Sequence, residues 1–427
     1  MINLLAISLL VAGAAVAQPE PPPMAEPPLE PLERVLIDRT LAQRPVRLMS
    51  IDASTIQVVD ATGRSQPIPR AELLAILPPL PPLDPPYVVP TTTQPIPANR
   101  VEDRPQVRTP APTPPQGRLE LVDGQIIPGT LATTPATKPE HIVWTSSLWG
   151  TLELPLDFVG AVVLNPERYD AADPARGTED TVLLRNGDRV DGFLESLTDS
   201  VKIERVGKAI EIPLSRIDGL RLANPIKRVG GAWVWMDRTA VAVSELSMGN
   251  SGTAALTGRI PGAASQPVAS VNGELLSAIC FDAGVVHPLA SMPMTVAGPA
   301  DSADRRWTPP PAITGLNGPL GAADIELPGP MRVEWTLPKG ATRFTATLEL
   351  PPSARLWGDC EVIIESVGPS NNAKPLARQS LNQAQHQAVI NTELSGAAKI
   401  RVTVHPGPSG PIQDRVVIRR ALAITAP

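Results

Sequence analysis

The sequence predicts an all-β protein in which tandem small β-barrel units, joined by proline-rich linkers, precede a larger C-terminal β-sandwich. Apolar residues alternate with polar ones over many short runs, which is typical of half-buried strands. Proline accounts for 52 of the 427 residues and aromatic residues for only 3%, so part of the chain can hold neither helix nor ladder hydrogen bonds. A strand pattern also recurs along the chain, which has room for roughly two to four domains.

The N-terminal run, residues 1–17, reads "MINLLAISLLVAGAAVA" and ends in the small residues that a signal peptidase recognises. We predict a signal peptide that is cleaved before Gln18. A retained anchor is the weaker alternative, because the run is too short for a membrane span. No later stretch reaches about 18 apolar residues, so we expect a soluble, exported mature chain without a membrane span. Its location would be the periplasm, the cell surface or the extracellular space.

Two segments are dense in proline, threonine and acidic residues, namely 18–34 and 78–117. Such segments cannot bury enough apolar surface to offset their ordering entropy, so they are predicted to be disordered, extended linkers. A role as a PxxP ligand is the alternative. A spacer is favoured in an exported chain.

An internal repeat organises the middle of the chain. Residues 119–131 read "LELVDGQIIPGTL", and residues 182–194 read "VLLRNGDRVDGFL" with the same spacing of apolar residues and glycines. A second element closes each copy, "LPLDFVGAVVL" at 154–164 and "IPLSRIDGLRL" at 212–222. Two separate stretches in register indicate a true repeat rather than a coincidence.

The repeat predicts small β units over 118–165 and 181–224. A degenerate copy is expected over 35–77, and 231–300 is a possible fourth unit or the start of the sandwich. Units of roughly 40 to 50 residues with four or five short strands are typical of SH3-like or Sm-like barrels.

Glycines mark the bends of the two clear copies. The Asp-Gly pair at 123–124 and the Asn-Gly pair at 186–187 predict two-residue hairpin turns with positive φ. Gly129 and Gly192 predict a bulge or a strong bend in the following strand.

The polar residues Asn186, Asp188 and Asp191 lie among glycines, a composition that calcium-binding loops share with ordinary turns. An EF-hand loop needs a bidentate Glu at its twelfth position, and the sequence has none there. The other copy shares the turn chemistry but not the candidate ligands, so the segment is interpreted as a turn.

From about residue 305 the alternating strands become longer, and turn residues separate them. This pattern favours a two-sheet sandwich of jelly-roll type, assigned to 301–427.

The C-terminal segment resembles the NPCBM family, carbohydrate-binding modules of exported bacterial proteins. The shared features are a Phe-x-Ala strand, a Gly-Asp pair, a Gly-Ala pair and an Asp before a final strand with a small residue. Here they are Phe344, Ala346, Gly358, Asp359, Gly396, Ala397, Asp414 and Ala421. The resemblance implies a galactose-binding-like β-sandwich, sometimes steadied by a structural calcium ion. The upstream units are similar to small β units that accompany this module in large surface proteins.

A sugar site needs a flat aromatic face together with carboxylate, amide or Arg groups for the hydroxyls. The C-terminal candidates are Trp307, Trp335, Trp357, Arg355, Asp359, Asn371, Asn372 and Asp414. Trp335 alternates with apolar neighbours, which predicts a core position. Trp357 lies in the polar loop "SARLWGDC", where packing explains an aromatic residue less easily. The predicted ligand-binding residues are Trp357, Asp359, Arg355, Asn371 and Asp414.

The cysteines and the charge exclude further classes. Cys280 and Cys360 are interpreted as buried hydrophobes, with one disulfide bridge between them as the alternative. The net charge of -6 and the pI near 5.4 disfavour nucleic acid as a partner.

Catalytic motifs are weak or absent. His287, His386 and His405 fall in no metal-ligand spacing, and the sequence has no P-loop and no C-x-x-C motif. The stretch "GNSGT" at 249–253 is similar to the nucleophile loop of chymotrypsin-like proteases, but only His141 lies upstream as a base, so a turn is favoured.

These observations favour an exported, non-catalytic protein whose sandwich binds a glycan or a cell-surface polysaccharide. No cofactor is expected other than the calcium ion that the resemblance allows. The first alternative is a structural or interaction protein that contacts surface proteins and binds no sugar. The second is a hydrolase, or the accessory part of one.

Overall fold

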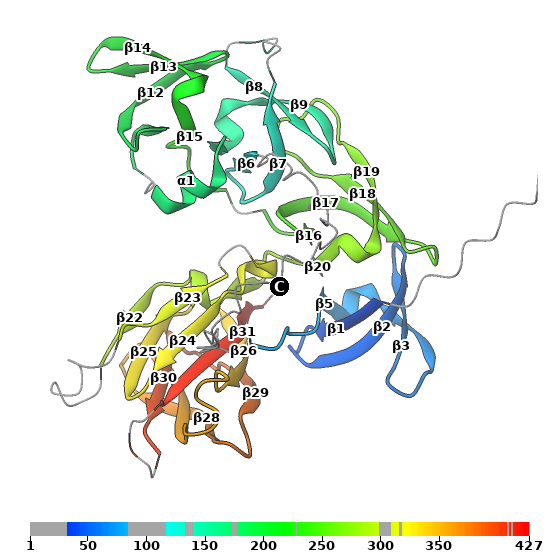
Figure 1. Ribbon diagram of the computed structural model, residues 1–427. Coiled ribbons are helices and arrows are strands. Elements are labelled where there is room, and N and C mark those ends of the chain that lie inside the picture. Colours follow the sequence, from blue (N-terminus) through cyan, green and yellow to red (C-terminus); the bar gives the residue numbers. More distant parts are fainter. Residues whose placement is uncertain are drawn as a thin grey trace, which may run out of the picture.

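The computed structural model describes most of the chain. The described residues are 32–83, 117–132, 136, 138, 140–172, 177–227, 229–298, 309–315, 318–407, 410 and 413–426. The predicted signal peptide, residues 18–31 and 84–116 of the predicted linkers, and Trp307 lie outside them. The described chain is almost entirely β-structure, with a single short α-helix, α1 (Pro166–Ala172), so the all-β prediction is confirmed (Figure 1). No helix in this part of the chain is long and apolar enough to cross a membrane.

The first twenty strands form four units of five strands each. Unit one contains β1 (Leu32–Asp38), β2 (Gln43–Ile51), β3 (Thr55–Val59), β4 (Ser65–Pro69) and β5 (Leu73–Leu77). Unit two contains β6 (Gly117–Leu121), β7 (Ile126–Leu131), β8 (His141–Ser146), β9 (Gly150–Pro155) and β10 (Val159–Val163). Unit three contains β11 (Asp180–Leu184), β12 (Arg189–Leu197), β13 (Ser200–Arg205), β14 (Lys208–Pro213) and β15 (Ile217–Arg221). Unit four contains β16 (Trp233–Met236), β17 (Thr239–Met248), β18 (Thr253–Gly258), β19 (Val268–Asn272) and β20 (Leu276–Cys280).

In every unit a single 3-10 turn leads into the fifth strand, and that strand pairs with the first strand of the unit. The turns are η1 (Arg70–Glu72), η2 (Leu156–Phe158), η3 (Leu214–Arg216) and η4 (Gly273–Leu275). Proline precedes the turn in units one, two and three, where its fixed φ suits the residue before a tight turn. Each unit therefore folds back on itself at the position of the closing element of the sequence repeat.

The hairpin turns of units two and three differ from the sequence prediction. The N–H of Gly124 donates to the carbonyl of Leu121, and the N–H of Leu121 donates to Gln125, so the loop has three residues rather than two. The same pattern recurs at 184–188 in unit three. Only the glycines have positive φ, 94° at Gly124 and 88° at Gly187. The Asp or Asn before each glycine instead accepts a hydrogen bond from the backbone two residues on, which stabilises the turn without positive φ.

The predicted strand bends at Gly129 and Gly192 are confirmed. Strand β7 pairs with β6 up to Gly129 and with β8 from Thr130, and β12 changes partner in the same way after Gly192. A Cβ atom on Gly129 would lie 2.6 Å from Trp144 Nε1 and closer still to the carbonyl oxygen of Thr145. Only glycine therefore permits β7 to approach β8 this closely where it changes partner from β6 to β8.

The units are joined through their closing strands. Strand β10 of unit two pairs with β15 of unit three, and β5 of unit one pairs with β20 of unit four. A single-residue pairing of β17 in unit four with β7 in unit two links the two pairs of units. A second one, of β17 with β2, adds a contact between units four and one. The result is one continuous 20-stranded sheet, and a common apolar core runs through it. The four units are therefore not independent domains, because they share one sheet and one core.

The C-terminal part is a sandwich of two antiparallel sheets. The six-stranded sheet contains β21 (Val286–Pro288), β23 (Ala312–Thr314), β24 (Asp324–Pro328), β26 (Ala341–Glu349), β29 (Gln387–Glu393) and β31 (Arg415–Thr425). The five-stranded sheet contains β22 (Met294–Val296), β25 (Met331–Thr336), β27 (Cys360–Val367), β28 (Ala373–Leu381) and β30 (Lys399–His405). Two further 3-10 turns are η5 (Leu289–Ser291) and η7 (Pro319–Gly321). Alternate residues of both sheets meet in one buried core. Strand β21 pairs with β31, so the sandwich already includes Val286, before residue 301.

The sandwich is docked on units one and four rather than tethered to them. A separate apolar cluster joins residues of the three parts, among them Leu74 of unit one, Ala278 of unit four and Leu422 of the sandwich. Asn391 also donates a 3.1 Å hydrogen bond to the carbonyl of Thr40.

Both cysteines are buried and free, in β20 and β27, which confirms their interpretation as small hydrophobic residues. Burial raises the pKa of each thiol, Cys280 and Cys360, to about 12. Since the thiolate is the reactive form, neither cysteine is poised for chemistry.

Candidate functional site

The structure separates the two described C-terminal tryptophans. Trp335 of β25 is fully buried in the sandwich core, as its alternation with apolar residues predicts. Trp357 lies in the loop between β26 and β27 and is 64% exposed, beside Leu356 at 60%. Two adjacent large apolar side chains at a loop tip are costly to leave in water, which makes this loop the candidate site.

The loop, residues 350–359, is held in shape by its own backbone. The N–H groups of Trp357 and Gly358 both donate to the carbonyl of Ala354, and the N–H of Ala354 donates to Pro351. Gly358 is required there, because a Cβ atom would lie 2.8 Å from the Ala354 carbonyl oxygen. The loop thus presents the indole ring from a fixed turn.

A buried ion network anchors the loop to the sheet. Arg355 Nη2 donates to Glu349 Oε1 at 2.7 Å, and Arg419 Nη1 donates to Glu349 Oε2 at 3.0 Å. Arg419 also bonds Asp324 at 3.2 Å. The side chain of Arg355 remains 35% exposed, so part of its guanidinium still faces solvent near Trp357.

Asp359 and Asp414 lie at the base of the same loop. Asp359 is half-buried, whereas Asp414 is only 2% exposed and therefore supports the loop from below. Neither carboxylate oxygen of Asp414 has a hydrogen-bond partner of normal geometry in the described part of the chain. Burial raises the pKa of Asp414 to about 6, and the charge of Asp359 adds to the rise. Backbone N–H groups of Asp359 and Gly407 approach closely enough to oppose this shift in part.

Asp414 makes stability depend on pH. Because its pKa in the folded protein lies above the ordinary value, the native state holds this proton more tightly than the unfolded chain does, so its contribution is lost as the pH rises from about 4 to about 6. We expect Asp414→Asn to flatten the dependence of the thermal midpoint on pH between 4.5 and 6.5. Asp52→Asn is the control, since the pKa of Asp52 lies at about 2 and outside this window. Equal slopes for the wild type and Asp414→Asn would contradict the assignment.

The structure does not bring Asn371 to the other predicted residues. Asn371 and its neighbour Asn372 are exposed in the turn between β27 and β28. The eight-residue strand β27 separates them from Asp359, a span of about 26 Å at the rise of a β-strand. Asn371 therefore lies at the opposite end of the sandwich, and the predicted residues do not form a single site.

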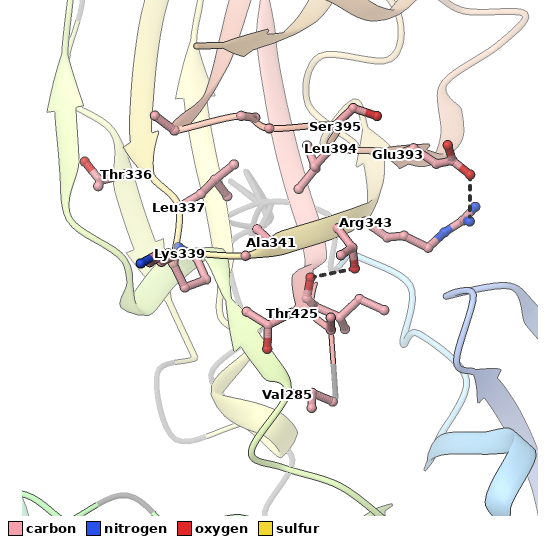
Figure 2. A pocket seen from close by; sticks show the side chains of 18 of the residues that line it. Val285, Thr336, Leu337, Lys339, Ala341, Arg343, Glu393, Leu394, Ser395 and Thr425 are labelled. Carbon is pink, nitrogen blue, oxygen red and sulfur yellow. Dashed lines mark hydrogen bonds and ion pairs between the residues drawn. The ribbon is translucent and has the colours of Figure 1, made fainter. Parts of the chain in front are cut away.

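The end of the sandwich that carries Asn371 borders a cavity of about 1110 Å³, shown in Figure 2. Its walls come from Arg39 and Leu74 of unit one, from three segments of the sandwich, 336–343, 393–398 and 424–426, and from Val285 and Pro369. Figure 2 shows the ion pair between Arg343 and Glu393, 3.2 Å long, on its wall. No pattern in the sequence indicates this cavity, because its walls are distant in the chain. Its lining residues are mainly aliphatic, with no aromatic ring.

The structure also places the residues of the weaker motifs. Ser251 lies in the hairpin turn between β17 and β18, in which Gly252 donates to Gly249. His141 lies in β8 with Nδ1 3.5 Å from Glu153. Within the described residues, no three His, Cys, Asp or Glu side chains gather to hold a metal ion.

No protein-family model matches the sequence, and no curated protein matches it either. Among solved structures, the chain is similar to the CBM51-2 and INT domains of Clostridium perfringens ZmpB in complex with GlcNAc, with 7% identity and a TM-score of 0.26 over 53% of this chain and 43% of that one. It is also similar to CBM51 of C. perfringens GH95 in complex with methyl-galactose, with 9% identity and a TM-score of 0.22 over 33% of this chain and 92% of that one. A third is the family 32 module of C. perfringens NanJ in complex with galactose, with 13% identity and a TM-score of 0.21 over 31% of this chain and 98% of that one.

These three solved structures are carbohydrate-binding modules or contain one. The chain spans less than half of the length of the ZmpB structure. At these scores the assignment of a β-sandwich rests on the strand pairing of the chain itself.

Proposed function

We propose that the protein is an exported, non-catalytic binding protein whose sandwich binds carbohydrate through the loop 350–359. The observation that carries the proposal is the 64% exposure of Trp357 on a loop whose backbone is fixed. An indole ring offers the flat apolar face on which the C–H face of a pyranose packs, and neighbouring charged groups bond its hydroxyls.

Arg355 and Asp359 are the polar groups of the proposed site. Arg355 is oriented by its bond to Glu349 and still reaches solvent, and Asp359 is half-buried two residues after Trp357. Asp414 would act only through the loop that it supports, and Asn371 has no place at this end of the sandwich. One ring and two polar groups on an open loop make a shallow site, so we expect weak binding to a single sugar or a chain end.

The test measures binding of the full chain to galactose, GlcNAc and bacterial polysaccharides by calorimetry and affinity electrophoresis. Trp357→Ala should lower the affinity at least tenfold and leave the thermal midpoint unchanged, because the exposed ring contributes little to packing. Phe193→Ala, which removes a 60% exposed aromatic ring of β12, is the matched control and should bind like the wild type. The proposal fails if no saccharide binds, or if Trp357→Ala binds as tightly as the wild type.

The proposal extends to membership of the NPCBM family, with SH3-like or Sm-like units as companions of the module. Support comes from the buried positions of Phe344, Ala346 and Ala421 and from the positive φ of 69° at Gly396, which suit the structural roles of these residues in the family pattern. The protein would act at the cell surface, in the periplasm or outside the cell. The proposal requires no cofactor, and calcium would enter only as a structural ion.

A second candidate function is binding of a surface protein by unit three. Phe193 is 60% exposed on β12, and Val206 is 95% exposed in the turn between β13 and β14. Apolar side chains of this size on a protruding hairpin favour contact with a partner. If Phe193→Ala abolishes binding of the surface protein and Trp357→Ala does not, this function is distinct from sugar binding.

A further inference from the structure

A second, smaller cavity of about 220 Å³ lies where unit one meets the sandwich. Its walls come from the end of β5 and the residues after it, from the region of the turn η7, and from the residues that carry charge. They are Leu77, Pro78, Leu80, Pro81, Thr314, Gly315, Pro319, Ala322, Asp324, Arg419 and Arg420. Two consecutive arginines in the mainly apolar strand β31 line this space. We propose that the cavity is a binding site for a small monocarboxylate, held by the guanidinium group of Arg420.

The charge of Arg419 is already balanced. Its guanidinium is almost fully buried and bonds Asp324 on one side and Glu349 on the other. Glu349 in turn bonds Arg355. Among the described residues, three guanidinium groups, counting Arg420, thus share the two carboxylates of Glu349 and Asp324, so one positive charge there is not balanced.

Arg420 carries that excess charge. The residue is 7% exposed, and its Nη2 donates a 2.7 Å hydrogen bond to the carbonyl of Pro78. Within the described part of the chain, the guanidinium group of Arg420 forms no ion pair with a carboxylate, since Asp324 and Glu349 pair with Arg419. Burial, together with the neighbouring charge of Arg419, lowers the pKa of Arg420 to about 10. A buried charge without a counter-ion destabilises a fold, so an anion in the cavity would be bound favourably.

The backbone aims Arg420 into the cavity at a local cost. Strand β31 is irregular at this point, because its register against β26 shifts between Thr345 and Thr347. Arg420 has a φ of 48°, which is unfavourable for a residue other than glycine. The two adjacent arginines consequently bond different partners, Arg419 the ion network and Arg420 the carbonyl of Pro78.

Size and charge select the ligand class. A water molecule occupies about 30 Å³ of liquid, so the cavity has room for a small organic acid but not for a polymer. A planar carboxylate matches the fork of a guanidinium group in two parallel bonds. Asp324 also lines the cavity, and its negative charge disfavours a dianion such as phosphate. Leu77, Leu80 and Pro81 provide an apolar wall for the carbon skeleton.

The experiment uses the full chain and titrates acetate, lactate and inorganic phosphate at constant ionic strength, with sodium chloride as the reference. Thermal unfolding and calorimetry are read together. We expect saturable stabilisation by acetate or lactate at millimolar concentrations, a weaker response to phosphate, and an affinity at least tenfold lower in Arg420→Met. Arg415→Met, which removes an exposed arginine of the same strand that pairs with Glu326, should respond like the wild type.

Asp324→Asn tests the same assignment in the opposite direction. Removal of this carboxylate frees the charge of Arg419, so the affinity for acetate should rise at least threefold. Trp357→Ala should leave the response unchanged, which separates this site from the proposed sugar site. The proposal is overturned if the carboxylates do no more than chloride, if phosphate binds more tightly than they do, if Arg420→Met responds like the wild type, or if Asp324→Asn binds acetate more weakly.

Discussion

Gly129→Ala is expected to lower the free energy of unfolding by about 3 kcal/mol, the upper range for overpacking a dense interior. A methyl group at this position would lie 2.6 Å from Trp144 Nε1 and closer still to the carbonyl of Thr145. Trp144 is fully buried and its Nε1 donates to Ile127, so the ring cannot move aside cheaply. Strand β7 would have to separate from β8, which opens unit two. Denaturant unfolding followed by tryptophan fluorescence measures the change.

Gly160→Ala is the matched control in the same unit. Gly160 lies in β10, and its added methyl group would be 3.4 Å from the nearest atom, the carbonyl oxygen of Glu120, which neighbouring atoms can accommodate. Its φ does not lie in the left-handed region, so alanine is compatible with the backbone there. If Gly129→Ala lowers the free energy of unfolding no more than Gly160→Ala does, the change of partner of β7 from β6 to β8 does not depend on glycine.

The second large effect is expected for Glu349→Gln. This carboxylate is 7% exposed on its side chain and bonds Arg355 on one side and the buried Arg419 on the other. Neutralising it leaves the charge of Arg419 dependent on Asp324 alone. Breaking a buried ion pair in this way costs about 3 kcal/mol or more. Because Arg355 loses its anchor, the affinity for sugar should also fall, which calorimetry with the preferred saccharide would measure.

Glu393→Gln makes the same chemical change in an exposed pair. Glu393 bonds Arg343 at 3.2 Å, but its side chain is 71% exposed, and such pairs contribute less than about 1 kcal/mol. Both variants make the same chemical change, one in a buried and one in an exposed ion pair, so the difference between their losses of stability measures the effect of burial. Similar losses of stability in both would mean that the network of Glu349 does not hold the loop to the sheet.

Gln125 shows what the sequence repeat can predict about the fold and what it cannot. The repeat marks residues 119–131 as a hairpin, and in the sequence Gln125 is only a difference from the other copy. In the structure Gln125 is fully buried. Its Nε2 donates to Asp123 and to the carbonyl of Arg259, and its Oε1 accepts from the N–H of Ala242. A turn residue of unit two is thus a hydrogen-bonded link to unit four, which pairwise comparison of the copies cannot detect.

The candidate site was predictable only in part, for a similar reason. Alternation with apolar neighbours predicts that Trp335 is in the core, and a polar setting predicts that Trp357 is in a loop. Both follow from local pattern, because side chains alternate between the faces of a strand. The separation of Asn371 from Trp357 depends instead on the direction and length of β27, and the burial of Asp414 depends on how two distant segments meet.

The sequence by itself determined the all-β class, the recurrence of small β units with four or five strands, and the glycine bends, because these depend on the spacing of residues that are close together in the chain. Only the tertiary structure decided that closing strands join the units in pairs and that the sandwich rests on units one and four. It also decided that Arg420 is buried with no carboxylate partner among the described residues. Strand pairing between units uses backbone N–H and C=O groups, which all residues other than proline carry, so no side-chain pattern specifies it. The charge balance of a buried site likewise depends on neighbours that are far apart in the chain.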